Sequence, residues 1–261
     1  MNAIEALLLG VVQGVTEFLP VSSSGHLVLF QTMFGIEGPG GLGFEVALHL
    51  ATLVAILLVY RARVVSLAGG TLRRDPASIR YVGKLAVATL PAVLVALTLS
   101  DWIEDSFARP ELAASCLLVT AVILWTTRRT IPVAVGSEPG WGAALLIGCA
   151  QAFAILPGIS RSGTTVAVAL ALGVSAGAAA EFSFLLGTIA MAGAAILILP
   201  GFGVENLALG PLLIGSAAAL VSGVGSIALF LRLLEHRNFY VFSYYLVFAG
   251  GASLAYWTLV R

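Results

Sequence analysis

Long apolar stretches alternate with short polar segments along the chain, and the lengths of these stretches predict helices that cross a membrane. A helix needs about 20 mostly apolar residues to span a bilayer. Because unpaired backbone groups are too costly in lipid, stretches of this length form helices there. Six stretches meet or nearly meet the requirement: 44–60, 84–100, 112–127, 182–200, 211–231 and 241–260.

Two more apolar regions, residues 1–36 and 141–173, are broken in the middle by turn-forming residues. Proline, serine and glycine interrupt the first region at 20–25 and the second at 157–163. A proline beside such a cluster ends a helix and begins a turn. Each half is too short to span a bilayer, so we expect two re-entrant helix-turn-helix hairpins, the first entering from outside and the second from the cytoplasm.

Basic residues are concentrated in three of the segments that connect the predicted spans. Cytoplasmic loops of membrane proteins are enriched in lysine and arginine, so these three segments are predicted to be cytoplasmic. The acidic segment 101–111 is expected on the outer side, as are both termini. The basic residues concerned are Arg61, Arg63, Arg73, Arg74, Arg80 and Lys84, then Arg128 and Arg129, then Arg232 and Arg237.

The two broken regions match each other at a constant offset of 138 residues. Within residues 10–26 the identical pairs are Gly10 and Gly148, Gln13 and Gln151, Ser22 and Ser160, Ser24 and Ser162, and Gly25 and Gly163. Chance matching of the small residues favoured in membrane helices is the alternative, but matches on Gln and Ser at the breaks favour a repeat.

The predicted fold class is therefore an all-α polytopic membrane protein, with six transmembrane helices and two re-entrant hairpins in one membrane domain covering residues 1–261. Repeat 1 covers about 1–127 and repeat 2 about 141–261. An odd number of spans separates the two copies, so the second is inverted. In such proteins the functional site usually lies where the broken helices meet.

Composition agrees with an integral membrane protein, since 59% of residues are hydrophobic and only 10% are charged, against about 25% charged in soluble domains. The 13 basic and 13 acidic residues cancel, which gives no basis for nucleic-acid binding. Cys116 and Cys149 lie in apolar runs and indicate packing rather than a disulfide or metal site. No lysine or arginine precedes Arg61, so we expect no secretory signal and a mature chain from Met1.

Gln13 and Glu17 are four residues apart on the first half-helix, so their side chains share one face. A carboxylate at membrane depth is costly and marks function by default. Oxygen ligands of this kind suit a divalent cation, Mg²⁺ or Ca²⁺. An interhelical hydrogen-bonding pair without a metal is the simpler interpretation of the same two residues.

Ser22, Ser23, Ser24 and Gly25 lead into a second half-helix that is predicted to begin near His26. The N-terminus of a helix presents free N–H groups and the positive end of the helix dipole, which together favour an anion. Ordinary N-capping accounts for one or two of the serines.

The second break repeats this arrangement and adds Arg161, whose guanidinium is always charged and binds phosphate or carboxylate oxygens. We expect its partner to be a bound anion, or Glu17 when no anion is present. The neighbouring candidates for binding the anion are Ser160, Ser162, Gly163, Thr164 and Thr165. At least two of the four hydroxyl side chains are expected only to cap or back-bond the helix.

A diphosphate bound by these groups would leave negative charge uncompensated. Each phosphoryl group carries about 1.5–2 negative charges, so a diphosphate exceeds what Arg161 alone neutralises, and Glu17 adds to the excess. A divalent cation would correct the imbalance, which predicts cation-dependent phosphoryl chemistry. Glu45 and His49, at the start of the first predicted span, are either supporting residues or interfacial ones.

These motifs resemble those of the undecaprenyl-diphosphate phosphatase family of the bacitracin-resistance type. Residues 13–17 resemble its (E/Q)xxxE motif, and residues 157–165 match its PGxSRSxxT motif throughout. Segments 17–26 and 180–186 also read as family sequence, and the resemblance covers essentially the whole chain. Position 13 carries Gln, which the motif allows but which removes one possible anionic metal ligand.

The resemblance implies a bacterial inner-membrane enzyme that removes the terminal phosphate of undecaprenyl diphosphate. It would recycle the lipid carrier of peptidoglycan synthesis and protect against bacitracin. The resemblance implies that Glu17 and Gln13 bind metal and pyrophosphate, that Arg161 clamps phosphate, and that Ser23 and His26 act as nucleophile or acid–base. The expected partners are the polyprenyl diphosphate, membrane lipids and a second copy of the chain in a homodimer.

Ser23 is the preferred nucleophile, with His26 as general base and later general acid. A phosphohistidine at His26 and direct attack by water fit the sequence nearly as well. A transporter that flips the lipid carrier is the rival function, since inverted repeats and opposed hairpins are transporter features.

Overall fold

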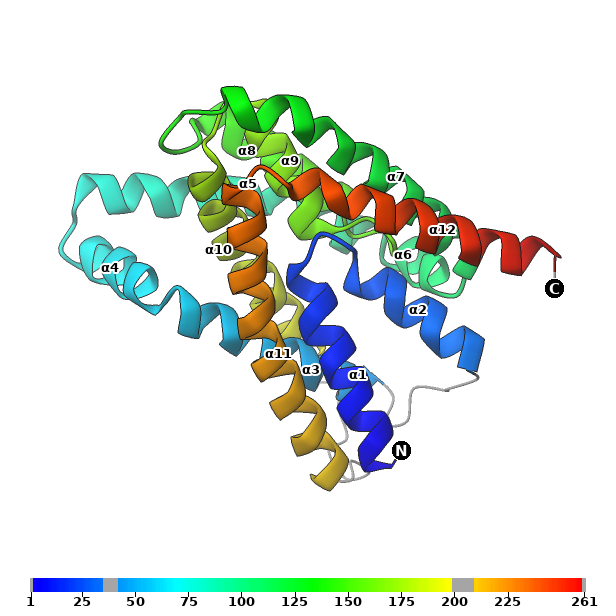
Figure 1. Ribbon diagram of the computed structural model, residues 1–261. Helices are drawn as coiled ribbons and strands as arrows, with labels where there is room; N and C mark the ends of the chain where they lie inside the picture. Colours follow the sequence, from blue (N-terminus) through cyan, green and yellow to red (C-terminus); the bar gives the residue numbers. More distant parts are fainter. Residues whose placement is uncertain (1, 35–41, 199–208, 260–261) are drawn as a thin grey trace.

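The computed structural model describes residues 2–34, 42–198 and 209–259, and these residues fold almost entirely into helices (Figure 1). The α-helices are α1 (Ala3–Phe18), α2 (Ser23–Phe34), α3 (Leu42–Val59), α4 (Arg61–Leu72), α5 (Pro76–Thr98), α6 (Ser100–Phe107), α7 (Pro110–Thr130), α8 (Trp141–Phe153), α9 (Arg161–Ala171), α10 (Ala176–Ile198), α11 (Leu209–Glu235) and α12 (Phe242–Leu259), with short 3-10 turns η1 (Ile131–Val133) and η4 (Phe239–Val241).

Each of the six predicted spans falls on a long helix, namely α3, α5, α7, α10, α11 or α12. Among the described residues, five helices are long and apolar enough to cross a membrane. Helix α3 adds a sixth if it is taken together with α4, from which it is separated by a bend of 78°. The chain is therefore a multi-pass helical membrane protein by length and composition. Residues 1, 35–36, 199–200 and 260, which end predicted segments, lie outside the described residues.

The start of α5 differs from the sequence prediction, because the helix begins at Pro76 and not at residue 84. The Asp75 side chain accepts hydrogen bonds from the N–H groups of Ala77 and Ser78 and so caps the helix there. Lys84 consequently lies within the helix, where it is buried and forms an ion pair with Glu138 at 2.9 Å. Its assignment to a loop was wrong: a charged partner on the segment before α8 makes burial of the lysine possible.

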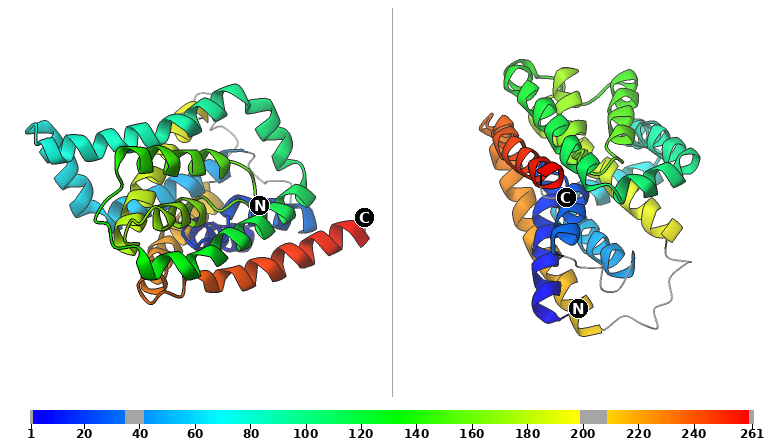
Figure 2. Two further views of the ribbon diagram at one scale, coloured as in Figure 1. Left: turned by 90° about the horizontal axis from the view of Figure 1, so that it is seen from above. Right: turned by 90° about the vertical axis from the view of Figure 1, so that its right-hand side faces the viewer.

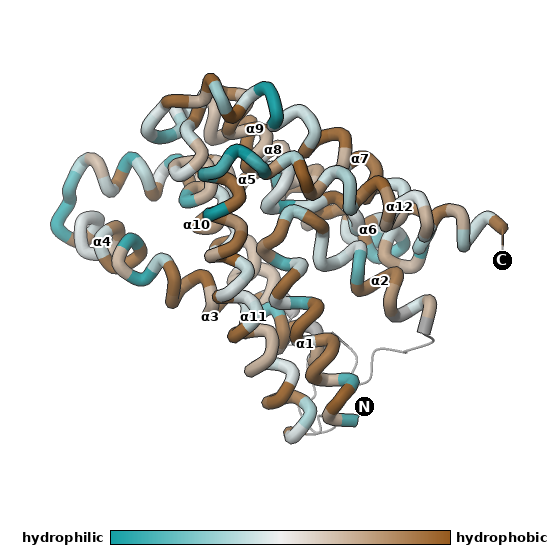
Figure 3. The backbone as a smooth tube through the Cα atoms, in the orientation of Figure 1, coloured by the Kyte–Doolittle hydropathy of each residue, from teal (hydrophilic) through white to brown (hydrophobic). Residues whose placement is uncertain are grey.

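Small residues set the closest helix contacts. Gly10 and Gly14 of α1 face Gly215 and Ala219 of α11 so closely that a Cβ on either glycine would overlap the α11 backbone. Glycines spaced four apart let two membrane helices approach in this way. Figure 2 shows α1 alongside α11 and α7 alongside α12. The outward sides of these helices carry apolar residues, and polar residues gather near helix ends (Figure 3).

The two predicted breaks are real interruptions of the helices. Helix α1 ends at Phe18 and α2 begins at Ser23, while α8 ends at Phe153 and α9 begins at Arg161. The turns between them, residues 19–22 and 154–160, form the tips of two V-shaped helix pairs. These tips meet in the middle of the molecule (Figure 1).

Candidate active site

Direct contacts hold the two tips together. The Ser22 hydroxyl accepts a hydrogen bond from the Gly158 N–H at 3.2 Å. Gly25 lies against the backbone of Gly158, where an added Cβ would stand only 2.7 Å from the Gly158 Cα. Ser22 and Gly158 both have positive φ, 71° and 94°, which bends each turn sharply. A side chain at 25 would force the tips apart, whereas one at 158 would overlap the Ala113 carbonyl of α7.

Equivalent serines start the second helix of each pair. The Ser22 hydroxyl accepts from the Gly25 N–H at 3.3 Å, and the Ser160 hydroxyl accepts from the Gly163 N–H at 3.2 Å. Both are N-caps, which confirms the capping interpretation for these two serines. The remaining first-turn N–H groups of α2 and α9 have no acceptor within their own helices, so two positive helix ends converge on one place.

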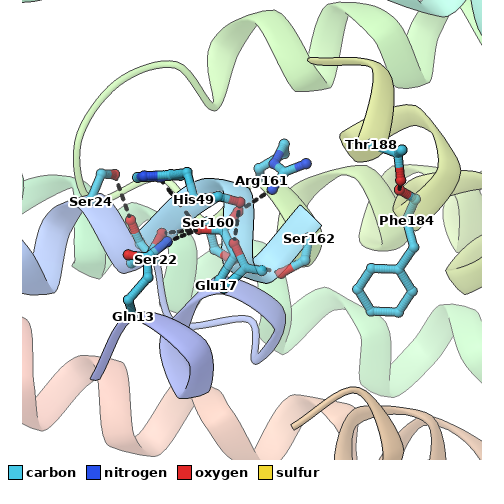
Figure 4. Close-up of polar contacts among 12 residues, drawn as sticks. Gln13, Glu17, Ser22, Ser24, His49, Ser160, Arg161, Ser162, Phe184 and Thr188 are labelled. Atoms are coloured by element: carbon cyan, nitrogen blue, oxygen red, sulfur yellow. Dashed lines mark hydrogen bonds and ion pairs between the residues drawn. The ribbon is translucent and has the colours of Figure 1, made fainter. Parts of the chain in front are cut away.

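Glu17 is the centre of the polar cluster between the tips (Figure 4). One carboxylate oxygen, Oε1, accepts a hydrogen bond from Nη2 of Arg161. The other, Oε2, accepts from the Ser23 hydroxyl at 2.5 Å and from the Gln13 amide at 3.1 Å. The expected contact between Arg161 and Glu17 in the absence of an anion is therefore confirmed.

Gln13 is fully buried and only half of its amide is used. Its Nε2 donates to Glu17, whereas its Oε1 is buried and has no hydrogen-bond partner among the residues that the structure describes. An unsatisfied buried carbonyl oxygen beside a carboxylate is unusual and costs about 1–3 kcal/mol. The pair thus presents oxygen atoms suited to a hard cation.

The predicted hydrogen bond between Ser23 and His26 is not formed, because each side chain has other partners. Both ring nitrogens of His26 are engaged: Nδ1 donates to the Ser22 carbonyl at 2.8 Å, and Nε2 accepts from the Tyr245 hydroxyl at 2.7 Å. Ser23 donates to Glu17 instead. Sequence spacing could not reveal this, because positions 23 and 26 are close on one face of α2, and their partners are set by Glu17 of α1 and Tyr245 of α12.

The other hydroxyl candidates divide between local structure and the site. Thr165 back-bonds to the Arg161 carbonyl at 2.7 Å and contacts Ser183, so it stabilises α9. The Ser162 hydroxyl reaches Ser160 at 3.4 Å, and Ser24 reaches Ser22 at 3.3 Å. The Thr164 hydroxyl is buried without a partner among the described residues.

His49 is a site residue that the sequence left undecided. It comes from α3, and its Nε2 lies 3.9 Å from Oε2 of Glu17, with 39% of the side chain exposed (Figure 4). The only sequence signal was its position at one end of an apolar span. The side chain of Glu45 lies outside the described residues.

Comparison with known proteins decides the family. A family model described as "Bacitracin resistance protein BacA" matches residues 6–252. The chain belongs to this family. An undecaprenyl-diphosphatase of Desulfosudis oleivorans is 38% identical, over 97% of this chain and 98% of its own length. Proteins of the same name from Carboxydothermus hydrogenoformans (38%; 97% of each chain) and Pelotomaculum thermopropionicum (39%; 97% and 96%) are similar to the same extent.

In this member of the BacA family, the two motifs used to recognise the resemblance are the two that meet in space. Glu17 and Gln13 come from the first motif and Arg161 from the second. They lie 144 positions apart in the case of Glu17 and Arg161, and only the packing of the tips brings them together.

Proposed function

We propose that this chain is an undecaprenyl-diphosphate phosphatase whose active centre is the cluster around Glu17 and Arg161. It releases the terminal phosphate and returns undecaprenyl phosphate to peptidoglycan synthesis, an activity that confers bacitracin resistance. Family membership supports the reaction. The observation that carries the location is the contact between Glu17 and Arg161, from opposite tips, beside two helix N-termini.

The membrane arrangement we propose has six spans and two re-entrant hairpins, α1–α2 and α8–α9, in an inverted repeat within the bacterial inner membrane. Support comes from the packing of each hairpin on a helix of the other repeat. Helix α1 of repeat 1 packs on α11 of repeat 2, and α8 of repeat 2 packs on α5 of repeat 1. Gly10 of α1 lies against Gly215 of α11, and its repeat equivalent, Gly148, lies against Ala88 of α5. The hairpins therefore meet near the middle of the bilayer.

The charges of the cluster require a cation when a diphosphate binds. Glu17 and Arg161 cancel each other, so the two phosphoryl groups, each with about 1.5–2 negative charges, are left uncompensated. We propose that Glu17 and the unsatisfied Oε1 of Gln13 hold Mg²⁺ or Ca²⁺, which binds carboxylate and amide oxygens together with phosphate oxygens. The bound cation supplies positive charge to the phosphoryl oxygens.

In the proposed reaction, the Ser23 oxygen attacks the terminal phosphorus while the bridging P–O bond breaks, so that undecaprenyl phosphate leaves. Glu17 takes the Ser23 proton, since the two groups are 2.5 Å apart. Arg161 and the first-turn N–H groups of α2 and α9 stabilise charge on the phosphoryl oxygens. Water then attacks the phosphoserine phosphorus as the bond to the Ser23 oxygen breaks. Inorganic phosphate leaves, and the proton held by Glu17 returns to the Ser23 oxygen.

His26 has a supporting part in this scheme. Its Nδ1–H fixes the carbonyl of Ser22, the residue with positive φ that precedes the nucleophile. His49 supplies a further donor from α3 that faces the phosphoryl group beside Glu17.

Phosphate release by the purified protein in detergent micelles tests the activity, because no sealed bilayer exists there and lipid transport cannot contribute. Arg161→Lys is expected to lower kcat at least about 100-fold, since a lysine loses the forked contact. Arg63→Lys is the matched control, because Arg63 pairs with Glu181 at 2.9 Å outside the site. Equal activity of the Arg161→Lys and Arg63→Lys proteins would disprove the location.

Trapping of a phosphorylated enzyme tests the nucleophile. Rapid quenching with labelled substrate should place the phosphate on Ser23, and Ser23→Ala should abolish the label and the activity. A Ser23→Ala protein with full activity would discard the serine mechanism in favour of attack by water.

A further inference from the structure

A groove of about 240 Å³ lies between α2 and α12, outside the polar cluster. Each helix contributes residues spaced three or four apart, so a single stripe of each lines the groove. The lining is formed by His26, Leu29, Phe30 and Met33 of α2 and by Tyr245, Ala249 and Ser253 of α12. Apart from the His26 ring and the hydroxyls of Tyr245 and Ser253, these side chains are apolar. Phe30 is 40% exposed and Met33 is 46% exposed.

The inner end of the groove adjoins the candidate active site. His26 forms that end, and its Nδ1 donates to the carbonyl of Ser22 at 2.8 Å. The next residue, Ser23, contacts Glu17 directly. On the other side of the ring, Nε2 accepts from Tyr245, whose ring is stacked on His26. The His26–Tyr245 pair therefore belongs to the wall of the groove and is hydrogen-bonded to the turn that carries the polar cluster.

We propose that this groove holds the isoprene units of the substrate nearest the diphosphate. The inference rests on the proposed function, since the substrate joins an anionic head covalently to a polyprenyl chain. An apolar surface must then begin next to the anion site. The groove meets that requirement because one residue, His26, belongs to its wall and is bonded to the turn that carries the anion site.

The size of the groove limits how much of the chain it can hold. At a rise of 1.5 Å per residue, positions 26–33 extend about 10 Å along α2 and positions 245–253 about 12 Å along α12. A chain of 55 carbons is several times longer, so the remaining units lie in the bilayer. Because lipid tails already cover the groove in a membrane, it selects by shape and not by removal of apolar surface from water.

Thiol protection tests occupancy without relying on catalysis. Ser253→Cys is made in a Cys149→Ser background, since Cys149 is exposed and Cys116 is buried. Undecaprenyl phosphate, the product, is expected to slow modification of position 253 by N-ethylmaleimide at least fivefold. Ala255→Cys, on an exposed part of the same helix, is the control and should react at an unchanged rate. Equal protection at 253 and 255, no protection at 253, or equal protection by a phosphatidic acid of ordinary chain length would overturn the proposal.

Kinetics separate this inference from the proposed function. Ala249→Trp fills the groove and should raise KM for undecaprenyl diphosphate about tenfold with less than a twofold change in kcat, whereas Ala255→Trp should match the unmodified protein. A wild-type protein that releases no phosphate contradicts the proposed function. An active wild-type protein together with an Ala249→Trp protein of unchanged KM contradicts the groove assignment alone.

Discussion

Glu17 is held by side chains from three helices, and each contact has a different chemical consequence. Arg161 of α9 neutralises it, Gln13 of its own helix orients it, and Ser23 at the start of α2 donates a hydrogen bond to it. A carboxylate buried among apolar helices is tolerated only with such partners. Removal of a partner is therefore expected to lower the stability of the fold as well as the activity.

Gln13 and Gln151 occupy the same position in the two repeats and provide a matched pair. Gln13 donates to Glu17, whereas both polar atoms of the Gln151 amide are buried and have no partner within the described part of the chain. Gln13→Leu should lower kcat/KM about 10- to 100-fold, because a hydrogen bond to a charged group is worth about 1.5–3 kcal/mol.

Gln151→Leu should leave kcat/KM unchanged and should keep or raise the thermal midpoint, since it removes an unsatisfied buried amide. Phosphate release and thermal unfolding in detergent measure both effects. A larger loss of activity in Gln151→Leu than in Gln13→Leu would contradict the asymmetry of the two repeats.

His49 is expected to act through its hydrogen-bond donor. His49→Ala should raise KM about tenfold, because the substrate loses one charge-assisted contact. His49→Gln keeps a donor at a similar reach and should remain within about threefold of the unmodified protein. Steady-state kinetics decide the matter, and equal effects of the two substitutions would show that His49 acts only by packing.

At the scale of the elements, the tips are built by serine caps and by glycines in close contact. Ser22 and Ser160 start α2 and α9 in the same way, and Gly25 and Gly158 let the two turns touch. Gly158 meets two demands together, since its φ is 94° and a Cβ would overlap the Ala113 carbonyl of α7.

Gly158→Ala should therefore destabilise the protein and disconnect the site. Positive φ costs a non-glycine residue on the order of 1–3 kcal/mol, and the steric overlap adds to it. Gly173→Ala is the control, because Gly173 also has a positive φ of 84° but no atom near the added Cβ. Thermal unfolding and phosphate release should both fall further in Gly158→Ala. Equal losses in the two variants would mean that tip packing contributes nothing beyond backbone strain.

At the scale of the whole molecule, charge is distributed unevenly between its two ends. The α4 segment and the ends of α7 and α11, which carry most of the basic residues, lie on the side away from both termini (Figure 1). Such an asymmetry orients membrane proteins with the basic side toward the cytoplasm.

This asymmetry predicts that both termini face away from the cytoplasm. Alkaline phosphatase fused after Arg261 should be active in cells, since it folds only outside the cytoplasm, and a fusion within 73–74 should be inactive. Green fluorescent protein at the same two positions should give the reverse pattern, and a fluorescent C-terminal fusion would refute the orientation.

The sequence by itself determined the elements and the chemistry available to them. Apolar length gave six helices, and the Pro-, Ser- and Gly-rich breaks gave the two interruptions within a few residues of 19–22 and 154–160. These features are local, because helix length, capping and turn formation depend on neighbours in the chain. The positions of Glu17 and Arg161 at these breaks also indicated that both are site residues.

Only the tertiary structure decided which groups touch. In the structure the Ser23 hydroxyl donates a hydrogen bond to Glu17 and not to His26. His49 of α3 lies beside Glu17, and Lys84 forms an ion pair with Glu138. None of these contacts follows from spacing, because each joins side chains from two different elements, whose relative position is set by helix packing.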